Sequence, residues 1–331
     1  MRILTIGGTQ FIGRHFVRAA LDGGHEVTIF HRGRTGAGLF LQATHLTGDR
    51  DQDLGALAAG RWDATVDFCA YRPGQVRALA AALGGRGGQH VLISSVSAYR
   101  TPAPSGFGED WPLAELADPE VQEVTDATYG GLKAACERAA LDAYGRAATT
   151  IIRPTYVIGP YDHSYRLTWW VERLARGGRV LAPGDPADPI QVIDARDLAA
   201  WLLDCAQARV TGIFDAVGPV VPLGAWVEQA REIGGHTGPV TAAGADWLLE
   251  QGVGQWMGPE SLPMWIAEPG WEGFAARSGQ RARAAGLVHR PRAELLTDVL
   301  AWERDQGLDR PRRAGLTAGR ERELLAALAS A

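Results

Sequence analysis

Short apolar runs alternate with amphipathic stretches through the first half of the chain. Runs of this kind indicate strands, and six are expected at Arg2–Ile6, Glu26–His31, Ala43–Leu46, Ala64–Phe68, His90–Ser94 and Thr149–Arg153. Helical periodicity between them predicts helices at Phe11–Leu21, Gly74–Leu83 and Thr128–Tyr144. Strand–helix alternation with nearly continuous apolar strands predicts an α/β fold, a doubly wound parallel (Rossmann) sheet covered by helices on both faces.

The alternation becomes less regular after Gly159 and Pro160. The expected elements are a helix at Tyr165–Arg176, a strand at Ile190–Ile193, a helix at Ala195–Ala206 and a strand at Ile213–Val217. From Leu223 onward the pattern predicts mostly helices and loops, with an irregular stretch at Pro259–Pro269. We therefore expect a smaller, mostly helical C-terminal part that is interwoven with the sheet.

A glycine-rich turn, Gly7-Gly8-Thr9-Gln10-Phe11-Ile12-Gly13, links the first expected strand to the first expected helix. Strand, glycine turn and helix form the context of a dinucleotide fingerprint, because the helix N-terminus offers N–H groups to a pyrophosphate. The expected cofactor-binding residues of this turn are Gly7, Thr9, Gln10, Phe11, Ile12 and Gly13. Residues 1–160, with 190–220 returning to them, are thus predicted to bind the dinucleotide. Residues 161–189 and 221–331 are predicted to bind the substrate.

Gln10 departs from the usual spacing, in which a glycine occupies that position. A side chain there stands where the backbone normally approaches phosphate. Either its amide donates to the pyrophosphate, or dinucleotide binding is weakened.

The residues at the end of the second expected strand help to predict whether the cofactor is NAD or NADP. Enzymes that use NAD usually place Asp or Glu there to hold the ribose, whereas this chain places Arg32 and Arg34 just beyond the strand. A guanidinium suits a 2′-phosphate, which favours NADP over NAD, although solvated loop charges are the alternative. Asp49, after the third strand, is expected either to contact the adenine or to cap a helix.

The chain contains one lysine, Lys133, four residues after Tyr129 at the start of an expected helix. Residues four apart share a helix face, so the phenol and the ammonium are expected to lie together. A surface i,i+4 pair is the alternative. The serine run Ser94-Ser95-Val96-Ser97 follows an apolar strand, and ligands of parallel sheets bind beyond the carboxyl ends of strands.

Together these motifs resemble the extended or atypical short-chain dehydrogenase/reductase family, which includes the NAD-dependent epimerases and dehydratases. The resemblance rests on five motifs: the glycine turn, the serine run before Tyr99, Y-G-G-L-K at Tyr129–Lys133, R-P-T-Y-V-I-G-P at Arg153–Pro160, and V-I-D-A-R-D-L-A at Val192–Ala199. They span residues 1 to about 200, and beyond about residue 220 the resemblance is faint.

The resemblance implies roles for particular residues. Tyr129 would be the acid/base, Lys133 would hold the nicotinamide ribose and favour the phenolate, and Ser95 would orient the substrate hydroxyl or carbonyl. Within R-P-T-Y, Thr155 is expected at the cofactor and Tyr156 at the substrate. The Asp-Glu pair of the family's dehydratases is replaced here by Val96 and Ser97, which argues against dehydration.

Other candidate residues are placed by their position along the chain. Cys69 and Ala70 are expected near the nicotinamide, and Tyr71 at the mouth of the cleft. His163 and Trp169 lie in a segment that borders the substrate in the family. The alternatives are an exposed loop histidine and a tryptophan packed in the core.

The amino-acid composition argues against nucleic acids and membranes as partners of this chain. With 46% hydrophobic and 21% charged residues and a net charge of −5, the chain lacks the positive field that nucleic acids or anionic membranes require. Three well-separated cysteines fit neither a disulfide framework nor a metal site, and no apolar run approaches the length of a membrane span. No signal-like segment precedes the first expected strand, so we expect a cytoplasmic protein. Together with the charge, this favours a small-molecule substrate.

We therefore expect an NADP-dependent oxidoreductase, with NAD possible, that acts on a secondary alcohol or ketone of a small sugar-like or natural-product substrate. A nucleotide-sugar epimerase that retains NAD is one alternative. A non-catalytic dinucleotide- or RNA-binding relative is another, because some chloroplast RNA-binding relatives share the G-G-T-x-F-I-G opening. Because members of the family often form dimers, the resemblance implies a homodimer through the helices at Gly74–Leu83 and Thr128–Tyr144.

Overall fold

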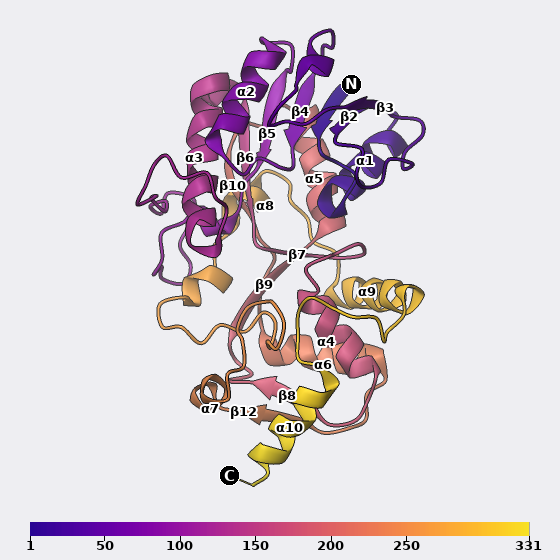
Figure 1. Cartoon of the computed structure of the whole chain (residues 1–331), viewed down its shortest axis with the longest axis vertical. Helices are drawn as coiled ribbons and strands as arrows, with labels where there is room; N and C mark the ends of the chain where they lie inside the picture. The colour runs from indigo at the N-terminus through magenta and orange to yellow at the C-terminus, as the bar shows by residue number, and fades with distance from the viewer. Residues whose placement is uncertain (331) are drawn as a thin grey trace.

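The computed structural model describes residues 1–330, and its centre is a seven-stranded parallel sheet in the order β10-β6-β5-β4-β1-β2-β3 (Figure 1). The strands are β1 (Arg2–Ile6), β2 (Glu26–His31), β3 (Thr44–Thr47), β4 (Ala64–Asp67), β5 (Gln89–Ile93), β6 (Thr149–Pro154) and β10 (Gly212–Ala216). The predicted doubly wound sheet is confirmed. The six strands expected in the first half lie within one residue of their predicted bounds.

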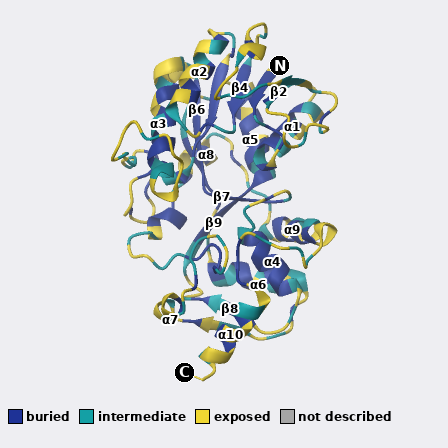
Figure 2. Cartoon of the chain, viewed as in Figure 1, coloured by how far each residue is buried: buried dark blue, intermediate teal, exposed yellow. Residues whose placement is uncertain are grey.

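Helices cover both faces of this sheet. They are α1 (Phe11–Asp22) and α5 (Ala195–Gln207), which pack together on one face, and α2 (Pro73–Leu83) and α3 (Asp126–Tyr144), which pack together on the other (Figure 1). The first layer packs on a core that includes Phe16 and Trp201, and the second on two smaller cores, one with Leu79 and one with Cys136. Figure 2 shows the strands as buried and the outer loops as exposed.

The remaining chain forms a second body that joins the sheet through β7 and β9 (Figure 1). Its strands are β7 (Tyr156–Ile158), β8 (Val180–Pro183), β9 (Pro189–Asp194), β11 (Val220–Pro222) and β12 (Val240–Ala243). Its helices are α4 (Arg166–Ala175), α6 (Leu223–Gly234), α7 (Ala245–Glu250), α9 (Arg292–Gln306) and α10 (Ala318–Leu328). Helix α8 (Gln280–Ala284) instead contacts β10 of the main sheet.

Four of these strands, β7, β8, β11 and β12, were not expected from the sequence. They contain three or four residues each, and runs of that length are hard to separate from loops by periodicity. Short 3-10 helices add η1 (Gly55–Leu57), η2 (Val96–Ala98), η3 (Arg146–Ala148) and η4 (Glu272–Ala275). The chain returns to the main sheet at α5 and β10. Residues 195 to 216 therefore lie beside the first half of the chain.

No helix within residues 1–330 is long and apolar enough to cross a membrane.

Candidate active site

Two cavities meet beyond the carboxyl ends of the central strands. The larger has a volume of about 1080 Å³ and the smaller about 780 Å³. They share the lining residues Phe11, Ile12, Phe68, Tyr71, Ile93 and His163. Because they share these walls, the two cavities form one cleft with two arms.

The glycine turn forms the floor of the smaller cavity. Gly7 and Gly8 have φ of +82° and +118°, a region that side chains other than glycine rarely adopt. A Cβ on Gly13 would lie 2.6 Å from the Cα of Gly8, so this contact between turn and helix requires glycine. The turn therefore has the close backbone packing that a dinucleotide fingerprint needs.

Gln10 is the N-cap residue of α1 and is exposed at the smaller cavity. Its side chain makes no capping hydrogen bond, and the first N–H groups of an α-helix have no partner within the helix. The N-terminus of α1 thus offers free donors to an anion, and the Gln10 amide can add another. These features fit the pyrophosphate of a dinucleotide.

The far end of the smaller cavity carries the residues expected at the adenosine. Arg32 and Arg34 line it and are exposed, with no acidic partner within 4 Å in residues 1–330. Asp49 also lines it, and its Oδ1 accepts a hydrogen bond from the Asp51 N–H at 3.0 Å. The alternative role of Asp49 as a helix cap is wrong, because the N-cap of the nearby η1 is Leu54.

A buried ion pair that the sequence analysis missed supports this region. Arg50 donates to both carboxylate oxygens of Asp67, with distances of 2.7 and 2.9 Å. Burial alone would raise the pKa of Asp67, but the Arg50 guanidinium outweighs it and holds that pKa below its usual range. Asp67 in turn accepts from the Cys69 N–H at 3.1 Å. A charged residue in a strand that is otherwise apolar was the signal for this pair.

Of the two residues expected beside the nicotinamide, only Cys69 lines the smaller cavity. Ala70 is fully buried and lines neither cavity, so its expected contact with the cofactor stays a prediction. Its carbonyl serves another purpose, since it accepts from Lys133.

One face of α3 carries Tyr129, Lys133 and Glu137, which are spaced four residues apart. Lys133 is 4% exposed, and its Nζ donates to the carbonyls of Ala70 and Ile93, both at 2.9 Å. These carbonyls lie beyond β4 and at the end of β5. The lone lysine is therefore buried against the sheet, and the alternative of a surface pair is wrong.

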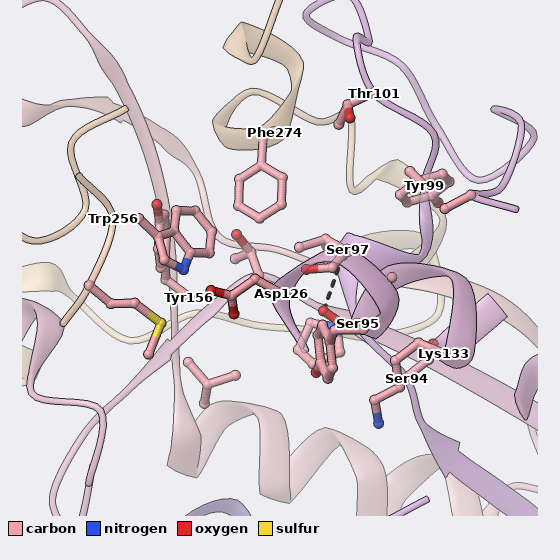
Figure 3. Close-up of a pocket in the computed structure, with 18 of the residues that line it drawn as sticks. Ser94, Ser95, Ser97, Tyr99, Thr101, Asp126, Lys133, Tyr156, Trp256 and Phe274 are labelled. Atoms are coloured by element: carbon pink, nitrogen blue, oxygen red, sulfur yellow. Dashed lines mark hydrogen bonds between the residues drawn. The ribbon is translucent and has the colours of Figure 1, made fainter. Parts of the chain in front are cut away.

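Tyr129 and Ser95 open on the larger cavity near Lys133. Nζ of Lys133 lies 5.9 Å from the ring centroid of Tyr129 and 5.0 Å from that of Tyr71. Ser95 is half-buried, and its Oγ accepts from the Ser97 N–H at 3.1 Å (Figure 3). The structure thus brings the three expected catalytic residues to one wall of the cleft.

A buried polar network lies behind this wall. Glu137 accepts from Nε and Nη2 of Arg153 at 2.9 and 2.6 Å, and from the Ser94 hydroxyl at 2.5 Å. The Tyr99 hydroxyl donates to Asp215 at 2.6 Å, and burial raises the pKa of Asp215 to about 6. The network joins α3 to β5, β6 and β10, so it fixes the wall to the sheet.

The residues expected at the substrate fall into two groups. Tyr71 and His163 line both arms of the cleft, and Tyr156 lines the larger one, as does Thr155, which was expected at the cofactor. Trp169 lines neither, because its indole is buried in the core of the second body and donates to the Leu316 carbonyl at 3.4 Å. The expectation of a substrate contact for Trp169 is therefore corrected to the core alternative.

Three further charged residues line the larger cavity. Asp126 and Arg277 were not recognised in the sequence, whereas Arg166 lies in the segment that was expected to border the substrate. Asp126 begins α3 one turn before Tyr129 and points into the cavity between Ser97 and Trp256 (Figure 3). Arg166 and Arg277 flank an aromatic wall of Tyr156, Trp256 and Phe274, with guanidinium carbons 4.9 Å from the rings of Tyr156 and Phe274 respectively.

Arg277 is the most unusual of the three. It is 3% exposed, its Nε has no hydrogen-bond partner, and no carboxylate lies within 4 Å among the described residues. Burial lowers its pKa to about 10. No sequence motif marks Arg166 or Arg277, because they reach the cavity from segments more than 100 residues apart.

Because Lys133 binds two buried carbonyls, we expect its ammonium to contribute to the stability of the fold. Replacing Lys133 with Met keeps the length of the side chain but leaves both carbonyls without this donor. We expect Lys133→Met to lower the free energy of unfolding by about 1–3 kcal/mol, the cost of losing partners for buried polar groups. Chemical denaturation measures this.

Arg138→Met is the matched control, because Arg138 is an exposed cation on the same helix. Its effect should stay within about 0.5 kcal/mol. Equal stability of Lys133→Met and the unmodified protein would contradict the anchoring role of Lys133.

Comparison with known proteins gives one sequence relative. No protein-family model matches the chain. The chain is similar to the chloroplast stem-loop binding protein of 41 kDa b of Arabidopsis thaliana, with 26% identity over 219 residues. The match covers 61% of this chain and 54% of that protein, so the chain spans about half the length of this curated relative.

Solved structures match almost the whole chain. UDP-N-acetylglucosamine 4-epimerase from Bacillus cereus has a TM-score of 0.68 and 16% identity, covering 94% of this chain and 99% of its own. UDP-glucose 4-epimerase from Thermotoga maritima, with UDP-glucose, has a TM-score of 0.66 and 17% identity, covering 92% and 99%. MoeE5 in complex with UDP-glucose and NAD has a TM-score of 0.63 and 19% identity, covering 92% and 99%.

These likenesses confirm the resemblance that the motifs indicated. The chain has the same fold as these nucleotide-sugar epimerases.

Proposed function

We propose that this chain transfers a hydride between a nicotinamide dinucleotide and a carbon that carries a secondary alcohol or ketone. The observation that carries the proposal is the position of Ser95, Tyr129 and Lys133. All three line the larger cavity close to its junction with the cavity that holds the glycine turn. A cofactor in one arm and a substrate in the other would meet beside these side chains.

The chain's own residues fit the cofactor. The glycine turn and the N-terminus of α1 would hold the pyrophosphate, Asp49 would face the adenine, and Cys69 and Thr155 would lie toward the nicotinamide. The bound cofactor supplies or accepts the hydride. Lys133 uses two of its three N–H groups on carbonyls, which leaves one for a ribose hydroxyl.

The proton accompanying the hydride would pass through Tyr129. In the reducing direction, the Tyr129 hydroxyl gives its proton to the substrate oxygen, and in the oxidising direction the phenolate takes it back. Ser95 would hold the same oxygen with its hydroxyl. The Lys133 ammonium would stand beside the reacting phenol, since its Nζ lies 5.9 Å from the ring centroid of Tyr129 and 5.0 Å from that of Tyr71.

The lining of the larger cavity favours a sugar-like substrate that carries an anionic group. Tyr156, Trp256 and Phe274 give a flat apolar surface for a ring, and Arg277 provides a buried cation without an acidic partner within 4 Å in the described chain. Asp126, between Ser97 and Trp256, is suited to accept hydrogen bonds from hydroxyl groups. Arg277 would then bind a phosphate or carboxylate.

A nucleotide-sugar 4-epimerase is the second candidate, and the likeness to the Bacillus and Thermotoga epimerases favours it. An epimerase returns the hydride to the same molecule, so its cofactor stays bound. Mass spectrometry of gently purified protein separates the two candidates. Stoichiometric NAD retained by the protein would favour the epimerase, and exchangeable NADP would favour the reductase.

RNA binding is a separate possibility, because the Arabidopsis relative is named for binding stem-loops. The net charge of −5 argues against it for this chain. A homodimer through α2 and α3 and a cytoplasmic location remain proposals from the sequence.

The acid/base role of Tyr129 yields the test of the main proposal. We expect Tyr129→Phe to lower turnover at least 100-fold, which is the usual contribution of a positioned acid/base, with little change in dinucleotide affinity. The assay follows NADPH absorbance with a panel of UDP-sugars and small ketones.

Tyr144→Phe is the matched control, because Tyr144 lies on the same helix but lines neither cavity. It should retain full turnover. A fully active Tyr129→Phe enzyme would rule out the proposed mechanism.

The preference for NADP is tested at Arg32. Arg32→Asp replaces a cation that can bind the 2′-phosphate with an anion that repels it. We expect the ratio of the dissociation constants of NADP⁺ and NAD⁺ to rise at least tenfold, because a charge-assisted hydrogen bond is lost. Calorimetry measures both constants, and an unchanged ratio would remove Arg32 from the cofactor site.

A further inference from the structure

Two imidazoles form a hydrogen-bonded pair beside the adenosine end of the smaller cavity. His31 ends β2 and His45 lies in the neighbouring strand β3. The Nε2 of His31 lies 2.9 Å from the Nδ1 of His45, and the two rings meet edge to face. His31 lines the cavity, whereas His45 does not.

The hydrogen-bond partners determine where the protons lie. The Nε2 of His45 is 3.2 Å from the carbonyl of Phe40, which can only accept, so that nitrogen carries a hydrogen. In neutral His45 the Nδ1 is then an acceptor, so the Nε2 of His31 is the donor. The Nδ1 of His31 is consequently free to accept from the Gly33 N–H, at 3.0 Å.

One tautomer of each neutral ring therefore satisfies all three hydrogen bonds in sequence. Gly33 donates to His31, His31 donates to His45, and His45 donates to Phe40. Both nitrogens of His31 are used, so this ring has no N–H left for a ligand in the cavity. Any influence of His31 on a ligand must pass through the backbone that it holds.

That backbone carries the two arginines expected at the 2′-phosphate. Gly33 has φ of +72° and lies between Arg32 and Arg34 in the turn that leaves β2. At the other end of the relay, Phe40 has φ of +59° and is buried shortly before β3 begins. The relay thus ties both the start and the later part of the connection between β2 and β3 to the sheet.

We propose that His45 is a positioning residue that sets the preference for NADP over NAD by holding the Arg32–Arg34 turn through His31. The inference rests on the proposed function, in which the smaller cavity takes a dinucleotide. If the relay is broken, the turn and its two long side chains must be ordered when the 2′-phosphate binds. That ordering reduces the affinity for NADP. NAD carries a hydroxyl at this position, so its affinity depends less on the turn.

The test measures the dissociation constants of NADP⁺ and NAD⁺ by calorimetry at pH 8. For His45→Leu we expect the NADP⁺ constant to rise about three- to tenfold, the effect of losing one or two hydrogen bonds, and the NAD⁺ constant to change less than twofold. His45→Phe keeps an aromatic ring without hydrogen-bonding atoms and gives the same test if the leucine variant does not fold.

His45→Asn is the rescue variant. Its side-chain oxygen stands where Nδ1 of His45 stood and can accept from His31, so most of the NADP⁺ affinity should return. His25→Leu is the control, because His25 precedes the opposite end of β2 and lines neither cavity. It should leave both constants unchanged.

The outcomes separate this inference from the proposed function. If the unmodified protein binds neither NADP⁺ nor NAD⁺, the proposed function itself fails. If it binds them and His45→Leu keeps the same ratio of constants, only the relay is overturned. An asparagine variant as weak as the leucine variant would likewise contradict a hydrogen-bonding role.

Discussion

The candidate site depends on one buried face of α3 and its contacts with the sheet. Lys133 binds carbonyls beyond β4 and at the end of β5, and one turn later Glu137 accepts from Ser94 and from Arg153 of β6. Removing one partner of a buried ion pair costs about 3–5 kcal/mol, so the helix can hardly slide or rotate on the sheet. This anchoring fixes Tyr129, one turn before Lys133, in the wall of the larger cavity.

The same arrangement places a cation behind the phenol, and its effect depends on how much water the cleft holds. Nζ of Lys133 lies 5.9 Å from the centre of the Tyr129 ring, and two unit charges about 6 Å apart interact by about 0.7 kcal/mol in bulk water and about 3 kcal/mol at an effective dielectric constant of 20. The aromatic wall of Tyr156, Trp256 and Phe274 lowers the local polarity of the larger cavity. A bound dinucleotide and substrate would exclude more water, so the lysine charge would act most strongly in the loaded site.

Local patterns predicted the features that depend on short stretches of chain. The strand periodicity, the glycine turn and the four-residue spacing of Tyr129 and Lys133 all indicated their structures correctly, because each is determined by neighbouring residues. The spacing did not reveal that Lys133 binds two carbonyls. Trp169 was misjudged because an indole on an amphipathic helix can face either a core or a ligand, and only the packing of the second body decides between them.

Features built from distant segments could not be read from the sequence. Arg277 reaches the larger cavity from a loop before α8, and the His31–His45 relay exists only because β2 and β3 pair in one register. The roles proposed for the site residues come from the resemblance of the motifs, which gives neither distances nor hydrogen-bond partners. The structure adds the contacts of these residues, such as the hydrogen bonds from Lys133 to the carbonyls of Ala70 and Ile93.

The account is tested most directly by a crystal structure of the protein with NADP⁺. It predicts the nicotinamide ribose in hydrogen-bond contact with Lys133, and the nicotinamide ring at the junction of the two cavities, facing Ser95 and Tyr129. A dinucleotide bound away from Lys133, or with its nicotinamide outside the cleft, would contradict the claim that the face of α3 builds the site.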